Sequence, residues 1–238
     1  MAEAPPDDPM WDPALVGATV DVLAALSDGG PALEFAIGTG RIAIPLAARG
    51  VAVTGIELDA DQVARLRARP GGGAEAIPVV VGDMAAVRAP GAGSFRLVYL
   101  VFNTIMNLTS QDEQVECFRN AAAHLAPGGR FLVETMVPAL RRLPPGERYV
   151  VFGLSEGYVG VDEYDVARQW LWSHHTTVEP GGRGHRRREP FRYVWPAELD
   201  LMARIAGLRL VDRWADWAGA PFTGDSPSHV CVWEKPGA

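Results

Sequence analysis

The sequence has few cysteines and no long apolar run, and both absences narrow the class of protein. Its 238 residues include only Cys117 and Cys231, without the spacing of a metal site, which is typical of reduced thiols in a cytoplasmic protein. No apolar stretch reaches the roughly 18 residues that a membrane-spanning helix needs. The N-terminus is acidic and proline-rich, so it lacks the basic and apolar regions of a secretory signal. We therefore expect a cytoplasmic protein without a membrane partner.

Positive charge is scarce as well, and the formal net charge is −7 at pH 7. Binding a phosphate backbone needs a basic surface, so this balance excludes nucleic acid as a partner. Residues 183–188 form a local basic run, which we interpret as a solvated loop or, alternatively, as a contact with an acidic substrate or partner. The 48% apolar content is ordinary for a globular protein, and 238 residues are enough for one large domain with a modest insert.

Apolar runs alternate with helical patterns over the first 137 residues. Residues 1–12 are expected to pack loosely, and an amphipathic helix is predicted at 13–27. Strands that are apolar on both faces and separated by helices are typical of a parallel sheet covered on both sides. The predicted elements are strands at 31–37, 51–57, 77–81, 95–102 and 130–135, and helices at 41–49, 60–69 and 111–125.

The pattern changes after residue 137. Proline and glycine are scattered through 138–190, and short β-rich pieces occur at 149–152 and 170–178. This segment is too long for a simple crossover between strands, so we interpret it as an inserted antiparallel flap or lid. The doubly wound α/β pattern then resumes with a helix at 197–206 and strands at 208–214 and 230–234.

The most informative stretch joins the first predicted strand to the helix that follows it. Gly38 and Gly40 form the turn, and a glycine lets the backbone approach a ligand closely because it has no side chain. A strand, a glycine turn and a helix N-terminus together form a nucleotide-sized binding site. The turn also fits the loose dinucleotide fingerprint of an NAD-dependent oxidoreductase, although the sequence supplies no evident hydride-transfer site for that alternative.

Three acidic residues stand at the ends of successive predicted strands. Glu57 ends the second strand, and a carboxylate there can accept hydrogen bonds from both hydroxyls of a ribose. Asp83 follows the third strand and suits an exocyclic amine such as that of adenine, whereas Glu34 precedes the glycine turn and suits an ammonium group. Each one alone is compatible with a solvated carboxylate. Three in register with the glycine turn indicate a ligand site, because ligands of open α/β sheets bind at the carboxyl ends of the strands.

These residues resemble the motifs of the class I S-adenosylmethionine-dependent methyltransferases. The combination is specific to that family, although each piece is weak alone, and it favours the methyltransferase over the oxidoreductase. The matching segments are 33–41 for the first motif, 55–59 for the ribose-binding motif, 82–84 for the adenine-binding motif, 95–104 for the fourth strand and the residues after it, and 125–134 for the fifth strand.

The resemblance implies a Rossmann-like, doubly wound α/β fold with a seven-stranded sheet, a closing antiparallel hairpin and an antiparallel insert. Residues 1–137 and 191–238 then form the cofactor-binding core with its N-terminal helix, and 138–190 form the flap over the substrate site. Ala36 stands where the family usually has its first glycine, and alanine is small enough to keep a close approach. The cofactor-binding residues that the resemblance implies are Glu34, Ala36, Gly38, Gly40, Arg41, Glu57, Leu58, Asp83, Met84 and Phe102.

The resemblance implies methyl transfer from S-adenosylmethionine to an oxygen or nitrogen atom of a small molecule, as in bacterial secondary metabolism. Such a displacement depends mainly on alignment, and a base is needed only if the acceptor arrives protonated. The resemblance implies that Asn103 borders the acceptor. As a general base we consider one of His174 and His175, because neighbours in a strand point to opposite faces and at most one faces the pocket. Both histidines are alternatively packing residues, and a metal site lacks a third ligand at useful spacing.

Three further alternatives stay open at this point. The chain could bind the cofactor without catalysis, or it could methylate a protein. Separately, it could form a homodimer. The sequence does not decide any of these questions. A DNA amide methyltransferase is disfavoured because residues 103–106 contain no proline. Trp170 and Trp172 suit flap packing or a substrate cage. Four more side chains are expected to close over the substrate, namely Trp11, Arg192, Tyr193 and Trp195.

Overall fold

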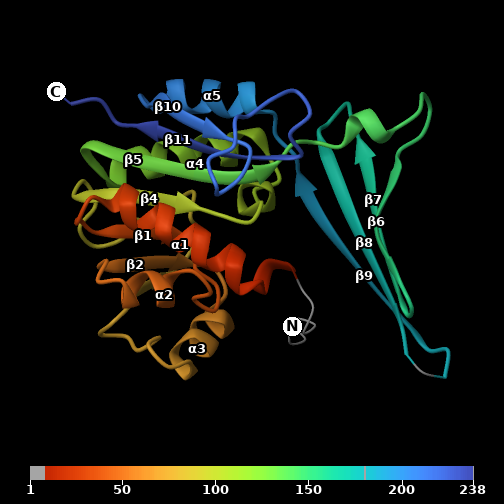
Figure 1. The fold of residues 1–238 in the computed structure, drawn as a ribbon, viewed down its shortest axis with the longest axis horizontal. Helices are drawn as coiled ribbons and strands as arrows, with labels where there is room; N and C mark the ends of the chain where they lie inside the picture. Colours follow the sequence, from red (N-terminus) through yellow and green to blue (C-terminus); the bar gives the residue numbers. More distant parts are fainter. Residues whose placement is uncertain (1–8, 180, 238) are drawn as a thin grey trace.

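The computed structural model of the chain describes residues 9–179 and 181–237 (Figure 1). The expectation of loose packing at residues 1–12 therefore lies outside the described residues for its first eight positions. Within the described part, Pro9–Trp11 forms a short 3₁₀ turn, η1, directly before the first helix. No helix in the described ranges is long and apolar enough to cross a membrane.

A seven-stranded sheet forms the centre of the molecule, with the strand order β10-β11-β5-β4-β1-β2-β3. The five strands from β1 to β5 run parallel, and β11 pairs antiparallel with both β5 and β10. This confirms the prediction of a doubly wound sheet with a closing antiparallel hairpin. The bounds are β1 (Ala32–Phe35), β2 (Val53–Glu57), β3 (Val79–Val81), β4 (Phe95–Leu100), β5 (Leu125–Met136), β10 (Arg209–Trp214) and β11 (Ser228–Glu234).

Helices cover both faces of this sheet and create two apolar cores (Figure 1). One core includes Phe118 and Leu199, which belong to α4 and α5, and the other includes Leu23, Leu46 and Leu66 from α1, α2 and α3. This double cover is the reason why the central strands are apolar on both sides. The bounds are α1 (Pro13–Ser27), α2 (Ala43–Ala48), α3 (Ala60–Ala68), α4 (Gln111–His124) and α5 (Pro196–Ile205).

Local sequence signals fix where several helices begin. Asp12 caps α1, since its side chain accepts a hydrogen bond from the Ala14 N–H, and Pro13 occupies the first helical position. Ser110 and Glu113 form a reciprocal capping box at the start of α4. Helix α2 begins at Ala43, two residues later than predicted, because the turn continues through Arg41 and Ile42.

A second sheet of four antiparallel strands, called the flap from here on, lies beyond the carboxyl ends of the parallel strands (Figure 1). Its strands are β6 (Tyr149–Ser155), β7 (Tyr158–Asp165), β8 (Trp170–Val178) and β9 (Gly184–Arg192). The prediction of an antiparallel insert is therefore confirmed. The predicted β-rich pieces correspond to β6 and β8, whereas strands β7 and β9 were not predicted. The interpretation of residues 183–188 as a solvated loop is wrong, because most of this run pairs with β8 as the edge strand β9. Edge strands tolerate such charged residues.

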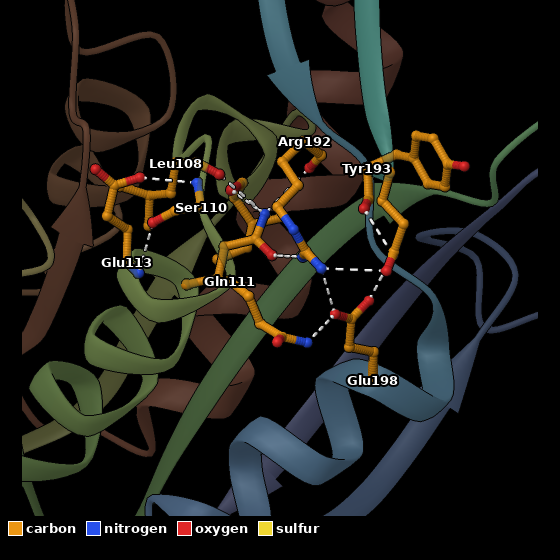
Figure 2. A network of polar contacts seen from close by, with 10 residues as sticks. Leu108, Ser110, Gln111, Glu113, Arg192, Tyr193 and Glu198 are labelled. Carbon is orange, nitrogen blue, oxygen red and sulfur yellow. Dashed lines mark hydrogen bonds and ion pairs between the residues drawn. The ribbon is translucent and has the colours of Figure 1, made fainter. Parts of the chain in front are cut away.

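A buried polar network holds the root of the flap to the main domain (Figure 2). Arg192, at the end of β9, forms an ion pair with Glu198 of α5 at 2.6 Å and donates a further hydrogen bond to Gln114 of α4. The Gln114 amide in turn donates to the carbonyls of Ile105 and Leu108, each at 3.1 Å. Arg192 is therefore an anchor, and the expectation that it closes over a substrate is wrong.

Tyr193 follows Arg192 and is also buried, with its ring 5.6 Å from that of Tyr164. Both side chains belong to the core that α4 and α5 cover. The expectation that Tyr193 closes over a substrate is wrong for the same reason. Trp195 remains partly exposed beside it, with its ring 6.4 Å from the Tyr193 ring.

Candidate active site

The glycine turn adopts the backbone conformation that its residue types allow. Gly38 and Gly40 have positive φ angles of 56° and 75°, and Ala36 also lies in the left-handed region at 53°. A Cβ at Gly40 would meet the Leu66 side chain at 2.1 Å, so this glycine is required for packing against α3. A Cβ at Gly38 would meet nothing nearer than 4.0 Å. The turn therefore presents open backbone at Gly38.

Glu57 ties the end of β2 to this turn. One carboxylate oxygen accepts a hydrogen bond from the Gly38 N–H at 2.7 Å, and the other accepts from the Asp59 N–H at 3.0 Å. The side chain is buried, yet each oxygen keeps a second lone pair for another donor. The carboxylate is thus fixed beside the turn in a position to accept hydroxyl hydrogens.

Glu34 lies deeper than Glu57. Its carboxyl group accepts a hydrogen bond from the Tyr99 hydroxyl at 2.9 Å, and burial raises the pKa of Glu34 to about 8. The Tyr99 hydrogen bond and the positive charge of Arg41 oppose that rise, whereas the nearby Glu57 adds to it. A carboxyl with this pKa is largely neutral at pH 7, and a cation placed beside it would favour its ionised form.

Apolar side chains are exposed at the carboxyl ends of β2, β3 and β4, and β1 separates β4 from the other two. Leu58 after β2, Val81 at the end of β3 and Phe102 after β4 have exposed fractions of 72%, 53% and 40%. Asp83 lies two residues after Val81, and its carboxylate accepts a hydrogen bond from the Ala85 N–H at 2.8 Å. Met84 is buried in the core. A row of exposed apolar side chains beside a carboxylate is a surface that a flat, polar-edged ring covers well.

The segment after β4 has an unusual backbone. Phe102 and Asn103 both have a φ of 58°, a left-handed conformation that costs free energy in residues other than glycine. Glu134 of β5 holds both, because its carboxylate accepts from the Phe102 N–H and its carbonyl from the Asn103 N–H at 3.2 Å. The Asn103 side chain accepts from the Met136 N–H at 2.6 Å. Asn103 therefore fixes the backbone at this edge.

Glu134 also belongs to this edge of the sheet, although the sequence motifs did not single it out. It is mostly buried, and burial raises its pKa above the usual glutamate value, although the Phe102 hydrogen bond and Arg41 oppose the rise. The signal was present, because Glu134 lies near the end of an apolar strand, as Glu57 does at the end of β2. Its place next to a strained backbone became visible only with the pairing of β4 and β5.

The two histidines of β8 point to opposite faces of the flap and have different partners. His174 contacts Glu163 through Nε2 at 3.0 Å and Arg186 through Nδ1 at 2.8 Å. His175 contacts the Tyr158 hydroxyl through Nδ1 at 2.8 Å and the Ser173 hydroxyl through Nε2 at 3.2 Å. Burial and the positive charge of Arg187 lower the pKa of His175, so its imidazole is neutral at pH 7.

Comparison with known proteins places this geometry in a family. A family model described as a methyltransferase domain matches residues 32–129. The solved structure of the CcbJ methyltransferase from Streptomyces caelestis is 36% identical, covers 94% of this chain and 90% of its own, and superposes with a TM-score of 0.84. The chain belongs to the S-adenosylmethionine-dependent methyltransferases.

Two further comparisons give one more relative in sequence and one more structure with the same fold. The cypemycin N-terminal methyltransferase of a Streptomyces species is 28% identical over 211 residues, which are 87% of this chain and 84% of that protein. The S-adenosylmethionine-bound structure of CalS10, an amino pentose methyltransferase from Micromonospora echinaspora, shares the fold with a TM-score of 0.71 at 19% identity. It covers 94% of this chain and 91% of its own.

The cofactor of this methyltransferase is S-adenosylmethionine, and the observed edge of the sheet fits it. The turn is open at Gly38, Glu57 keeps lone pairs for two hydroxyls, and Leu58, Val81 and Phe102 are exposed apolar side chains at the same edge. The chemistry of these groups matches the polar and apolar parts of an adenosyl group.

Proposed function

We propose that this methyltransferase methylates an amino nitrogen of a small molecule that lies between the carboxyl edge of the central sheet and the flap. The observation that carries the proposal is the fixed edge itself, where the glycine turn, Glu57 and the strained pair Phe102 and Asn103 are all held by hydrogen bonds. The preference for nitrogen over oxygen is supported by a relative whose name specifies N-terminal methylation.

Carboxylates on the flap also favour an amine. Asp162 and Glu189 face the same side of the flap as His175, because both are cross-strand neighbours of Ser173. Burial raises the pKa of Asp162 to about 6, and a hydrogen bond from Ser173 opposes that rise. A cationic amine beside Asp162 would stabilise its charged form, whereas a neutral alcohol would not.

The residues proposed to hold the cofactor follow from the same edge. Glu57 and Leu58 would bind the ribose, Asp83 and Met84 the adenine, and Phe102 would separate the adenosyl group from the acceptor. Glu34 and Arg41 would face the charged groups of the methionine part, with Ala36, Gly38 and Gly40 giving the backbone room to approach. The positions of these residues along successive strand ends support each assignment.

The chemistry of the step is a displacement at carbon. The bound cofactor supplies a methyl group on a positively charged sulfur. The acceptor nitrogen forms a bond to that carbon, the carbon–sulfur bond breaks, and its electron pair remains on sulfur. The protein holds the acceptor in line, and Phe102 and Asn103 supply a rigid boundary for this alignment. An acceptor that arrives as an ammonium must lose one proton before this step, because the attacking nitrogen needs a free electron pair.

We propose that His175, rather than His174, is the general base that accepts this proton. His175 is neutral and contacts two hydroxyl groups, Tyr158 and Ser173, each of which can both accept and donate a proton. His174 lies between a carboxylate and a guanidinium, which fixes its ring within an ion-pair network. His174 is therefore proposed as a packing residue of the flap, and Asn103 as a residue that fixes the edge.

The flap is proposed as the lid over the acceptor, which corresponds to the predicted insert at 138–190. The name of the cypemycin relative supports a place in bacterial secondary metabolism. A cytoplasmic location and a homodimer stay predictions from the sequence.

The test measures release of S-adenosylhomocysteine from S-adenosylmethionine with pairs of acceptors. Each pair joins a compound with a free amine, such as a short peptide or an amino sugar, to its N-acetylated form. We expect product with at least one free amine and none with its N-acetylated partner. Equal turnover of both members, or turnover only of hydroxyl compounds, would contradict the assignment to nitrogen.

A further inference from the structure

The turn η1 touches the site from a part of the chain that none of the matched motifs includes. The family match begins at residue 32, whereas η1 covers Pro9–Trp11. Two arginines connect η1 to the glycine turn and to the end of β4. We propose that Trp11 is a cofactor-binding residue of this protein and that Arg69 and Arg41 are positioning residues that hold it over the glycine turn.

Arg69 provides the first connection. Its guanidinium donates a hydrogen bond to the carbonyl of Thr39, within the glycine turn, at 2.9 Å. The same guanidinium lies over the Trp11 indole, 5.3 Å from the ring centroid. A single side chain therefore spans the space between Trp11 and the turn. Trp11 and the glycine turn are therefore both in contact with one guanidinium group.

Arg41 provides the second connection, on the other side of the turn. It follows Gly40 directly and donates a hydrogen bond to the Met10 carbonyl at 2.9 Å. Its guanidinium also lies 5.3 Å from the centre of the Phe102 ring. The positive charge of Arg41 acts on Glu34 and Glu134 as well, which places it among the carboxyl groups of this edge.

The chain after Trp11 is fixed too. Asp12 caps α1, and the Asp12 carbonyl accepts from the Val16 N–H at 2.9 Å, so α1 holds the turn from its C-terminal side. The Met10 and Trp11 side chains are only half-buried in this arrangement. A large indole that is held in place without being fully covered has surface left for a ligand to bury. The cofactor on the glycine turn is the group that lies within reach.

The experiment measures binding of S-adenosylhomocysteine by isothermal titration, so it needs no acceptor. We expect Trp11→Ala to weaken binding by roughly tenfold, as for loss of an aromatic anchor, and Trp11→Phe to retain most of it. Arg69→Gln should weaken binding by about threefold because the cation–π contact is lost, whereas Arg69→Lys should restore most of the affinity. The matched control is Arg49→Gln, which removes a surface ion pair with Asp21 and should bind as the parent does.

A second measurement covers the case in which Trp11→Ala fails to fold. Binding of S-adenosylhomocysteine should change the tryptophan fluorescence of the parent more than that of Trp11→Phe, because Trp11 becomes buried by the ligand. Equal fluorescence changes in both proteins, or parental affinity in a folded Trp11→Ala, would overturn the proposal. Neither measurement involves the acceptor. A negative result would therefore overturn the role of Trp11 and would not affect the proposed specificity for an amine, which has a separate test.

Discussion

The central sheet and the flap are stabilised by different kinds of contact. All four residues of β1 are buried, and the Phe118 ring packs edge-on against Phe131 and Trp233 at 4.9 and 5.3 Å in the adjoining core. Most residues of β9 are exposed, and its arginines bind His174, Glu163 and the Trp172 ring. The cofactor edge thus rests on a rigid apolar support, whereas the flap can change its surface residues without disturbing that support.

This difference separates two tasks. The carboxyl edge must keep hydrogen-bond donors and acceptors at fixed positions, and packed strands provide such fixed positions. The flap is proposed to fit the acceptor, and a sheet held by polar contacts accepts many side-chain combinations. The two parts join at Arg192, so a substitution there should have the largest effect on stability.

The largest effect is expected at that junction. Arg192→Met should lower the free energy of unfolding by about 2–4 kcal/mol, because the mostly buried Glu198 would lose its positively charged partner and keep only the hydrogen bonds from Gln111 and Gln169. The double variant Arg192→Met with Glu198→Leu should recover much of this loss. Urea unfolding measures both, and Arg209→Met, which removes the exposed ion pair with Glu234, is the control. An equal loss in the control would mean that burial of the junction does not matter.

The next effect concerns the cofactor edge alone. Glu57→Ala removes the acceptor for the Gly38 and Asp59 N–H groups and should weaken binding of S-adenosylhomocysteine by about 1–3 kcal/mol. Asp83→Ala should weaken it within the same range. Titration calorimetry provides the measurement, with Glu75→Ala as an exposed control. If both site variants bind as the parent does, the cofactor lies elsewhere.

A pH effect should distinguish the buried carboxyl of the central sheet from those of the flap. Burial raises the folded pKa of Glu34 to about 8, so the folded state keeps a proton that the unfolded state has lost. Stability should therefore fall as pH rises from 4.5 toward 8, by at most about 1.4 kcal/mol per pH unit. Glu34→Gln should flatten this dependence in urea unfolding at several pH values. An unchanged slope in that variant would assign the dependence to another group.

The smallest effect is expected on the flap surface. Arg188→Gln removes the guanidinium that lies 3.7 Å from the centre of the Trp172 ring, together with a partly exposed ion pair to Glu163. The free energy of unfolding should fall by about 1 kcal/mol or less. Arg168→Gln, at an exposed ion pair with Asp165, is the matched control. A loss comparable to that of Arg192→Met would show that the flap depends on its surface charges as strongly as on its root.

The central sheet was predictable because its strands are buried on both faces. Uninterrupted apolar runs such as residues 95–102 stand out against the helices between them, and the carboxylates at their ends follow from the order of the elements. Strands β7 and β9 were not predictable in the same way. Strand β7 contains a glycine and three acidic residues, and β9 contains a run of three arginines. Their pairing partners, not their own composition, make them strands.

The polar network at the flap root could not be predicted from the sequence, for another reason. Arg192, Gln114, Gln169 and Glu198 are drawn from four separate elements or loops, and no local pattern links them. Their meeting depends on how the flap folds back onto α4 and α5. The same holds for η1, where Arg41 and Arg69 reach Met10 and Trp11 across about thirty or more residues of chain.

The left-handed pair Phe102 and Asn103 has one more consequence. A loop that became ordered only around its ligand would subtract the free energy of that ordering from the affinity. Here hydrogen bonds within the protein itself, from the Phe102 N–H to Glu134 and from the Met136 N–H to Asn103, secure the bend. The free-energy cost of this bend is therefore part of folding, and an acceptor that binds as proposed would not have to supply it.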